Sequence, residues 1–370
     1  MIVQGRIVTP DRIVSGRVRV DGDRIAAIVG GDPGPAGWIV PGFVDIHNHG
    51  GGGHTFTTGE PDDARAAASF HLRHGTTTLL ASLISAPPQE LRTAVGSLAP
   101  LVDDGALAGL HLEGPYLSPA RRGAHHPAHL RHPSTRELAD LIDLGAGAIR
   151  MVTLAPELPG ALEAIGLLAD RGVVAAVGHT DATYEQTGRA LDAGASVATH
   201  LFNAMRPVHH RDPGPVPALL GAPGVVCELV ADGVHLHDGV LAFAARAAGR
   251  AGAALVTDAT APAGMPDGRY DLGRLPVRVE GGVARLVTTE GTSGAIAGST
   301  LTMDAALRRA VGAGVSLVDA VAMAATTPAR AIGLGGVTGA LVPGHRADLV
   351  ELDADLRVRR VMRAGTWVSR

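Results

Sequence analysis

Six segments of the chain place histidine or acidic residues directly after an apolar run, and these residue types can hold a metal ion. His47 and His49 flank one asparagine, so an extended backbone would turn both imidazoles to one face. Glu113 ends another run, where an unpaired carboxylate would be costly to bury. Four further runs end in the same way, at His179, His200, Asp232 with His235, and Asp258. Imidazoles and carboxylates brought to one level would form a metal site.

Taken singly, each of these residues also has an ordinary structural explanation. A lone core histidine is more often hydrogen-bonded than ligating, and a glutamate at a strand end is often a cap or half of a salt bridge. The shared position of all six segments favours the metal interpretation. The mixture of imidazole and carboxylate suits Zn²⁺, with Fe²⁺, Mn²⁺ or Co²⁺ as alternatives.

The segments that must position these residues alternate strand-like apolar runs with helical stretches. Continuous apolar runs are typical of parallel strands covered on both sides. Eight strands alternating with helices predict an α/β fold, a (β/α)8 TIM-like barrel, with chemistry at the carboxyl ends of the strands. The predicted strands are residues 42–46, 76–83, 109–112, 149–154, 173–177, 196–199, 225–230 and 254–257. The predicted helices between them are 62–74, 88–101, 134–144, 160–171, 183–193, 215–220 and 239–248.

Both ends of the chain instead read as short strands separated by turns. Residues 2–8, 12–20 and 24–29, and again 348–352 and 358–367, are strand-like, and 31–37 reads as a linker. We therefore expect a small β-sandwich domain from residues 1–40 and 338–370, and a barrel domain from 41–337. After the eighth strand, 262–270 is rich in turn residues, and 277–280 with 283–288 predict an inserted hairpin. Helices are predicted at 303–312 and 317–325, and 326–328 can begin another.

Composition excludes several classes of function. The net charge of the 370 residues is −4 and no basic run stands out, so nothing indicates nucleic-acid binding. No apolar run approaches the roughly 20 residues of a membrane span, and no signal-peptide pattern is present, so we expect a cytoplasmic protein. The sequence has no lysine, which excludes Schiff-base chemistry, a P-loop and a carboxylated-lysine bridge between metals. The single cysteine, Cys227, reads as a small buried hydrophobe.

Several motifs resemble a known enzyme family. The run Pro-Gly-Phe-Val-Asp-Ile-His-Asn-His-Gly at 41–50 resembles the opening motif of the amidohydrolase superfamily. His-Leu-Glu-Gly-Pro-Tyr-Leu at 111–117, Gly-His-Thr at 178–180 and Thr-His-Leu-Phe-Asn-Ala-Met at 199–205 resemble, more narrowly, the N-acetylglucosamine-6-phosphate deacetylase family. Ala-Asp-Gly-Val-His at 231–235 and Ala-Gly-Ser at 297–299 fit the same family. The matching segments run in the family's order from about residue 41 to 352.

The resemblance implies a metal-dependent hydrolase, usually a homodimer, that removes acetate from N-acetylglucosamine 6-phosphate in amino-sugar catabolism. It implies that Glu113, His179 and His200 hold the main metal. Some family members lack the His-x-His pair and use one metal. This sequence keeps His47 and His49, so a second ion is expected, with Glu113 bridging the two.

Substrate contacts carry over by motif. The Asn203 side chain and the Ala204 backbone resemble the family's phosphate-binding elements, and Arg211 stands at the position of an arginine that reaches across the dimer into the neighbouring site. A planar guanidinium suits a phosphate dianion. His125 and His235 stand at sugar-contacting positions. The sugar is expected to pack against Ile296, Ala297 and Gly298, and the resemblance assigns no role to His54, Thr55, His209 or His210.

Asp258 is the candidate acid/base residue, which would take a proton from water and return it to the departing nitrogen. It could instead be a pure metal ligand, or serve both roles. A nucleophilic serine is a weaker reading, because the sequence has no Gly-x-Ser-x-Gly elbow. The open alternatives are a deacetylase for the galacto-configured sugar phosphate, a deaminase, a cyclic amidase, or a sugar-phosphate sensor without activity.

Overall fold

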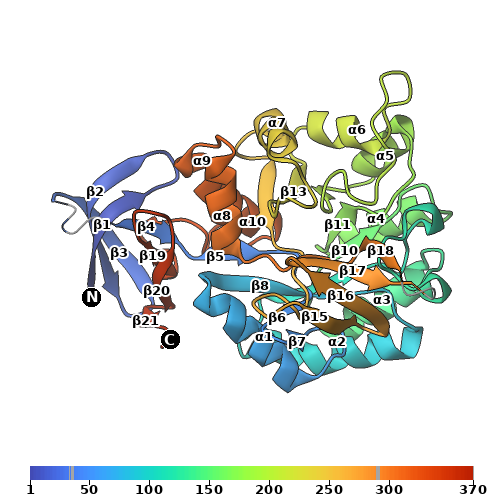
Figure 1. The fold of residues 1–370 in the computed structure, drawn as a ribbon, viewed down its shortest axis with the longest axis horizontal. Coiled ribbons are helices and arrows are strands. Elements are labelled where there is room, and N and C mark those ends of the chain that lie inside the picture. The colour runs from blue at the N-terminus through green and yellow to red at the C-terminus, as the bar shows by residue number, and fades with distance from the viewer. Residues whose placement is uncertain (33, 35–36, 289–291, 370) are drawn as a thin grey trace.

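Eight parallel strands form the centre of the computed structural model, which describes residues 1–370 except 33, 35–36, 289–291 and 370 (Figure 1). Each strand pairs with the next one along the chain, so the sheet grows in sequence order. All eight predicted strands are confirmed, and their ends differ from the predicted ends by at most one residue. They are β5 (Phe43–Asp45), β8 (Thr76–Leu83), β9 (Gly109–Glu113), β10 (Ile149–Leu154), β11 (Val174–Val177), β12 (Val197–Ala198), β13 (Val226–Val230) and β14 (Ala253–Val256).

The seven predicted helices between the strands are also confirmed. Each packs a stripe of aliphatic side chains onto the barrel, and one large cluster of buried residues unites these stripes with the strands. Side-chain caps fix some of the starts: Ser134 accepts from the Glu137 amide, and Thr183 forms a capping box with Gln186. The helices are α1 (Pro61–Arg73), α2 (Pro88–Asp103), α3 (Thr135–Gly145), α4 (Ala161–Asp170), α5 (Tyr184–Asp192), α6 (Pro215–Gly221) and α7 (Asp238–Ala248).

The barrel closes between β14 and β5 beyond the ends of both strands. The Asp258 amide donates to the His47 carbonyl at 2.9 Å, and the His49 amide donates to the Ala259 carbonyl at 2.8 Å. The buried Asp45 carboxylate accepts from the Thr257 hydroxyl at 2.6 Å and from the Thr257 amide at 3.2 Å. The closure therefore joins the segment of the His-x-His pair directly to the segment of Asp258.

The insertion after β14 is larger than the hairpin that the sequence predicts. It is a four-stranded antiparallel sheet of β15 (Gly268–Leu272), β16 (Leu275–Glu280), β17 (Val283–Val287) and β18 (Ser293–Ile296). β15 begins inside the stretch predicted as turn-rich, because its pairing partner β16 supplies hydrogen bonds that local sequence does not reveal. The sheet packs an apolar cluster against Ile84 and Ala124 of the barrel loops.

The helices that follow the insertion are confirmed with one change. α8 (Met303–Gly312) has the predicted bounds, and a short α10 (Thr327–Ala331) begins near the predicted third helix. The predicted helix 317–325 is divided into α9 (Leu317–Val321) and a π-helical turn, η3 (Ala322–Thr326). This turn packs against β5 and β14. A π-turn widens the helix where it meets the two strands that do not pair along their length.

Strands from both chain ends form one seven-stranded sheet beside the barrel (Figure 1). The sheet curls back on itself, because the Ala347 amide donates to the Asp23 carbonyl and the Ile25 amide to the His345 carbonyl. Its own apolar cluster lies inside the curl, as expected for the small β domain. The strands are β1 (Ile2–Val8), β2 (Ile13–Asp21), β3 (Arg24–Gly30), β4 (Trp38–Pro41), β19 (Leu349–Leu352), β20 (Val358–Arg363) and β21 (Thr366–Trp367).

Two details of this sheet differ from the prediction. The predicted strand 358–367 is a hairpin of β20 and β21, because Ala364 and Gly365 adopt left-handed backbone angles (φ 47° and 77°) that make a tight two-residue turn. β4 is a separate strand that was not predicted from the sequence, and it follows the predicted linker 31–37. Residues 33 and 35–36 of that linker lie outside the described residues. The domain boundaries at residues 40 and 338 stay a prediction.

No helix among the described residues is long and apolar enough to cross a membrane.

His71 on α1 anchors the loop that follows the His-x-His pair. Its fully buried ring donates from Nε2 to the Gly50 carbonyl at 2.9 Å. Burial lowers the pKa of His71 from 6.5 to about 4, so the ring is neutral in the folded protein. Because the unfolded chain binds this proton more readily, acid favours the unfolded state. The neutral His71 ring therefore makes its full contribution to stability above pH 6.5, and this contribution is lost as the pH falls towards 4.

We predict that the free energy of unfolding of the wild type falls by about 2 kcal/mol more than that of His71→Gln between about pH 7.5 and pH 5. Glutamine can still donate to Gly50 but does not titrate, and the other titrating groups are common to both proteins. Urea unfolding with added chelator at the two pH values measures the difference. Parallel losses in the two proteins would contradict the assignment.

Candidate metal centre and active site

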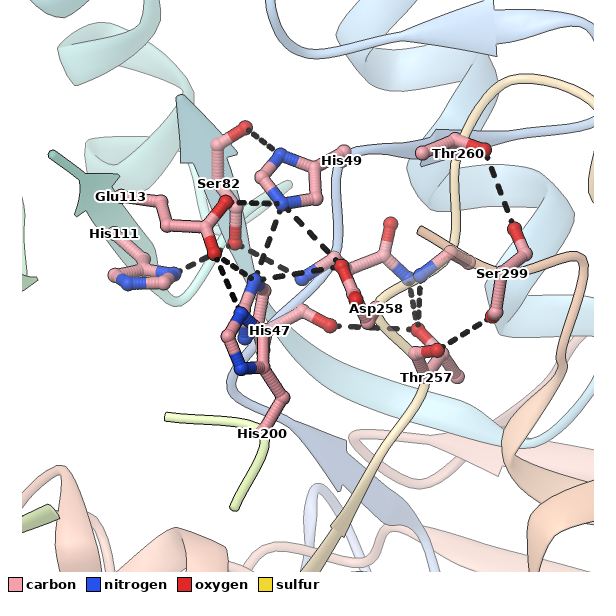
Figure 2. A network of polar contacts seen from close by, with 12 residues as sticks. His47, His49, Ser82, His111, Glu113, His200, Thr257, Asp258, Thr260 and Ser299 are labelled. Atoms are coloured by element: carbon pink, nitrogen blue, oxygen red, sulfur yellow. Dashed lines mark hydrogen bonds and ion pairs between the residues drawn. The ribbon is translucent and has the colours of Figure 1, made fainter. Parts of the chain in front are cut away.

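Six buried side chains from five strand ends converge into two adjoining groups of ligand atoms. Figure 2 labels His47, His49, Glu113, His200 and Asp258 among them. In one group, Glu113 Oε1 lies 3.0 Å from His179 Nε2 and 3.1 Å from His200 Nε2. The other Glu113 oxygen, Oε2, lies 3.1 Å from His49 Nε2. The second group comprises His47, His49 and Asp258. The structure therefore brings together all of the predicted metal ligands, with Glu113 between the two groups.

The imidazole nitrogens of each group lie too close together to be explained by packing alone. The Nε2 atoms of His47 and His49 are 3.1 Å apart, and those of His179 and His200 are 3.0 Å apart. Asp258 Oδ1 lies 3.5 Å from each nitrogen of the first pair. Lone pairs that converge at such distances repel one another unless a cation lies between them, so the donor set fits divalent metal ions.

Hydrogen bonds on the far side of three rings leave their Nε2 atoms free to bind metal. His47 Nδ1 donates to the Glu228 carboxylate at 2.9 Å. His49 Nδ1 donates to the Ser82 carbonyl at 3.1 Å, and His179 Nδ1 donates to the Arg121 carbonyl at 2.9 Å. Since each Nδ1 carries the proton, each Nε2 presents a lone pair to the centre, the usual arrangement around a ligating histidine.

Strained backbone turns aim several of these side chains inwards. His179, His200 and Asp258 each lie two residues beyond a strand end and have positive φ angles of 48°, 29° and 49°. Non-glycine residues adopt this region at a cost of order 1–3 kcal/mol each, and such strain clusters at functional sites. His47 and His49 instead reach one side of the centre through the alternation of an extended segment.

Charge balance keeps the central carboxylate ionised. Burial alone would raise the pKa of Glu113, but His47, His125 and His179 together hold it well below its usual range. Burial would likewise lower the pKa of His47, but the Glu228, Glu113 and Asp258 carboxylates raise it well above 6.5. The pocket is therefore strongly negative around its imidazoles, which favours a bound cation.

Two further histidines face the centre as hydrogen-bond donors. His125 Nδ1 accepts from the Ser85 amide at 3.3 Å, so its proton lies on Nε2, 3.3 Å from Glu113 Oε2. His235 Nδ1 donates to Asp232 Oδ2 at 2.6 Å. Although burial lowers the pKa of His235, its hydrogen bond to Asp232 and the Asp258 charge raise it above 6.5, so the ring can donate from Nε2. His125 therefore differs from the three metal-facing rings in its tautomer, whereas His235, like them, carries a proton on Nδ1 and donates from Nε2 only as the doubly protonated ring.

A cavity of about 330 Å³ opens over the ligand groups and is large enough for a small polar ligand. The predicted substrate residues His125, Asn203, Ala204, His235, Ile296 and Gly298 line it. Ala297 is fully buried in the apolar cluster beneath the insertion sheet, so it lies behind the wall. Arg211 is exposed on the loop after Ala204 and lies outside the cavity of its own chain.

Several site residues were not predicted from the sequence. Glu228 on β13 and Ser82 on β8 orient the metal-facing rings, and their signal was a polar residue inside an apolar strand. Arg121 lines the cavity and donates from Nε to Asp181 at 2.8 Å, and Leu272 of β15 also lines it. Leu272 could not be expected, because the strand that carries it was not predicted.

Comparison with known proteins gives consistent results. The profile of the Amidohydrolase family matches residues 38–368. N-acetylgalactosamine-6-phosphate deacetylase of Escherichia coli O157:H7 is 39% identical over 90% of this chain and 88% of its own. N-acetylglucosamine-6-phosphate deacetylase of Lysinibacillus sphaericus is 35% identical over 89% of this chain and 84% of its own.

The structural comparison covers the whole chain. A solved structure of N-acetyl-D-glucosamine-6-phosphate deacetylase from Mycobacterium smegmatis, an aspartate-to-alanine variant in complex with N-acetyl-D-glucosamine-6-phosphate, has a TM-score of 0.96 and 45% identity. The match covers 100% of this chain and 99% of that chain. The enzyme from Thermotoga maritima has a TM-score of 0.92 and 34% identity over 100% of both chains.

We predict that Glu113→Gln weakens metal binding by more than about 100-fold, the upper range for losing only an outer partner of a ligand. The substitution replaces the carboxylate shared by both ligand groups with a neutral amide of the same size. Metal content after gel filtration measures the loss. Glu163→Gln, on the exposed face of α4, is the control and should retain the wild-type content. Wild-type metal content in Glu113→Gln would contradict the ligand assignment.

Proposed function

The chain belongs to the amidohydrolase family, and from this premise we propose that it hydrolyses N-acetyl-D-glucosamine 6-phosphate to D-glucosamine 6-phosphate and acetate. The observation that carries the proposal is the pair of buried ligand groups joined by Glu113 beneath a cavity of about 330 Å³. The similarity to deacetylases of amino-sugar phosphates over nearly the whole chain supports this substrate class.

The proposed cofactor is one or two divalent ions per chain, with zinc favoured by the imidazole and carboxylate donors. Glu113, His179 and His200 would hold the first ion, and His47, His49 and Asp258 the second, with Glu113 shared. When bound, such an ion polarises the amide carbonyl and makes water a nucleophile at neutral pH.

Asp258 is proposed to move the proton during amide hydrolysis. Its Oδ1 faces the His47 and His49 nitrogens, whereas Oδ2 lies 3.9 Å from His235 Nε2 on the cavity side. One Asp258 oxygen would therefore help to hold the ion, and the other faces the cavity where the substrate would lie. As water attacks the carbonyl carbon, Asp258 takes its proton, and it passes this proton to the nitrogen as the C–N bond breaks.

His235 and His125 are proposed to stabilise the negative charge that develops on the carbonyl oxygen and to orient the sugar. Both offer an Nε2 proton towards the cavity, and both are held by hydrogen bonds to Asp232 and Ser85. Donors fixed in advance stabilise a developing charge at little reorganisation cost.

The phosphate is proposed to bind at Asn203 and the Ala204 backbone, with Arg211 supplied by a second copy of the chain. Arg211 is exposed, and among the described residues its guanidinium contacts the neighbouring His210 ring at 2.7 Å, so it can extend towards another subunit. This arrangement makes the functional unit a homodimer. A phosphorylated sugar does not cross membranes unaided, so we place the reaction in the cytoplasm.

We predict that the metal-loaded wild type releases acetate rapidly from N-acetylglucosamine 6-phosphate, and that Asp258→Asn lowers kcat by about 10²–10⁴-fold. The physical reason is the loss of the group that carries the proton. Unphosphorylated N-acetylglucosamine should react at least about 100-fold more slowly in kcat/KM, because charge-assisted phosphate contacts are lost. Coupled detection of acetate measures all three rates.

The galacto isomer of the sugar phosphate is the necessary comparison, because one relative carries the name of a galactosamine deacetylase. The proposal expects the gluco isomer to have the higher kcat/KM. A preference for the galacto isomer would transfer the function to that sugar. No acetate from any of the three sugars would overturn the deacetylase assignment while leaving the metal centre to be tested separately.

Mixed dimers test the role of Arg211. We predict that Arg211→Ala and Asp258→Asn chains, each weakly active alone, regain about 25% of wild-type activity when co-expressed in equal amounts. Half of the dimers would then be mixed. Each mixed dimer would contain one intact site, with Asp258 from one chain and Arg211 from the other, so a quarter of all sites would be intact. Activity no greater than the sum of the single variants would contradict a shared site.

A further inference from the structure

A carboxylate outside both ligand groups contacts one member of each. Glu228 lies in the middle of β13 and is fully buried. Its Oε2 accepts from His47 Nδ1 at 2.9 Å and from the His200 backbone amide at 3.0 Å. The His47 and His200 rings stack with their centroids 5.5 Å apart (Figure 2). Glu228 therefore holds the two rings where the ligand groups meet.

This carboxylate is costly to retain for packing alone. Its strand is otherwise apolar, and its second oxygen, Oε1, has no hydrogen-bond partner among the described residues. Placing a carboxylate in a low-dielectric interior costs several kcal/mol unless charged partners compensate. The His47 ring supplies part of this compensation, and a cation held by the ligand group that the ring belongs to would supply more.

The partners of the other metal-facing rings make Glu228 distinctive. His49 and His179 donate to main-chain carbonyls, which are neutral acceptors. Among these three metal-facing rings, His47 alone donates from Nδ1 to a carboxylate. A charged acceptor makes the imidazole a stronger electron donor to metal and fixes its tautomer more firmly.

The second contact of Glu228 fixes a strained residue. His200 has a φ of 29°, at the edge of the left-handed region, and its own Nδ1 is buried without a partner in the described part of the chain. The ring therefore has no hydrogen bond on the side away from the metal centre to orient it, in contrast to His47, His49 and His179. The backbone bonds around it, from its own amide to Glu228 Oε2 and from the Leu201 amide to the Glu228 carbonyl at 2.9 Å, hold it in place.

We propose that Glu228 is a positioning residue that couples the two halves of the metal centre. Its charge sets the tautomer and donor strength of His47, and its geometry fixes the backbone of His200. Metal affinity at both ligand groups therefore depends on one residue that touches neither metal nor substrate. The inference rests on the metal centre of the proposed function.

The test measures Zn²⁺ binding directly, by metal content and by competition with a chromophoric chelator, so it does not depend on activity. Glu228→Ala removes both hydrogen bonds and should weaken binding at both ligand groups by about 10–100-fold. In Glu228→Gln, the amide oxygen can still accept both hydrogen bonds, but the charge is lost. This variant should keep two ions at saturation and bind the weaker one about tenfold less tightly.

Cys227→Ala is the matched control, because Cys227 is the buried neighbour on the same strand and its Sγ approaches the Leu219 carbonyl away from the metal centre. It should lose stability without loss of zinc affinity. Wild-type zinc constants in Glu228→Gln, with Glu228→Ala either unchanged or unable to fold, would overturn the inference. A wild type that binds no zinc would overturn the proposed metal centre and, with it, this inference.

Discussion

The charge of one buried carboxylate, Glu113, constrains the whole rim of the barrel. Its two oxygens lie within 3.5 Å of the Nε2 atoms of His47, His49, His179 and His200. A carboxylate at 3% exposure is stable only if positive charge or donors surround it. The barrel meets that demand because eight parallel strands deliver their carboxyl ends to a single level.

The residues behind the rings determine what each histidine can do. The same side chain turns a free Nε2 towards a candidate ligand group at His49, acts as a donor at His125 and is a neutral anchor at His71. The difference lies in which nitrogen already has a partner: the Ser82 carbonyl takes the Nδ1 proton of His49, whereas the Ser85 amide donates to Nδ1 of His125. Function is thus assigned by hydrogen bonds one step away from the chemistry.

Sequence reasoning succeeded where pattern and position are local. The apolar runs predict the eight strands to within a residue. The polar residues that follow them predict a cluster that includes Glu113 and His179, and the structure brings this cluster together because strand ends in a barrel share one level. It fell short where the outcome depends on distant partners. Glu228 was not predicted as a site residue because it lies inside a predicted strand, and its role arises only when β13 lies beside His47. β15 was missed because it depends on pairing with β16.

The most direct test of the proposed two-ion centre is anomalous diffraction from crystals of the zinc-loaded protein, recorded on both sides of the zinc absorption edge. The structure predicts two zinc peaks, one among Glu113, His179 and His200 and one among His47, His49 and Asp258, each about 2.0–2.2 Å from its ligand atoms. A single peak in the first group would restrict the centre to one ion. No peak within either group would contradict the metal centre on which the proposed chemistry depends.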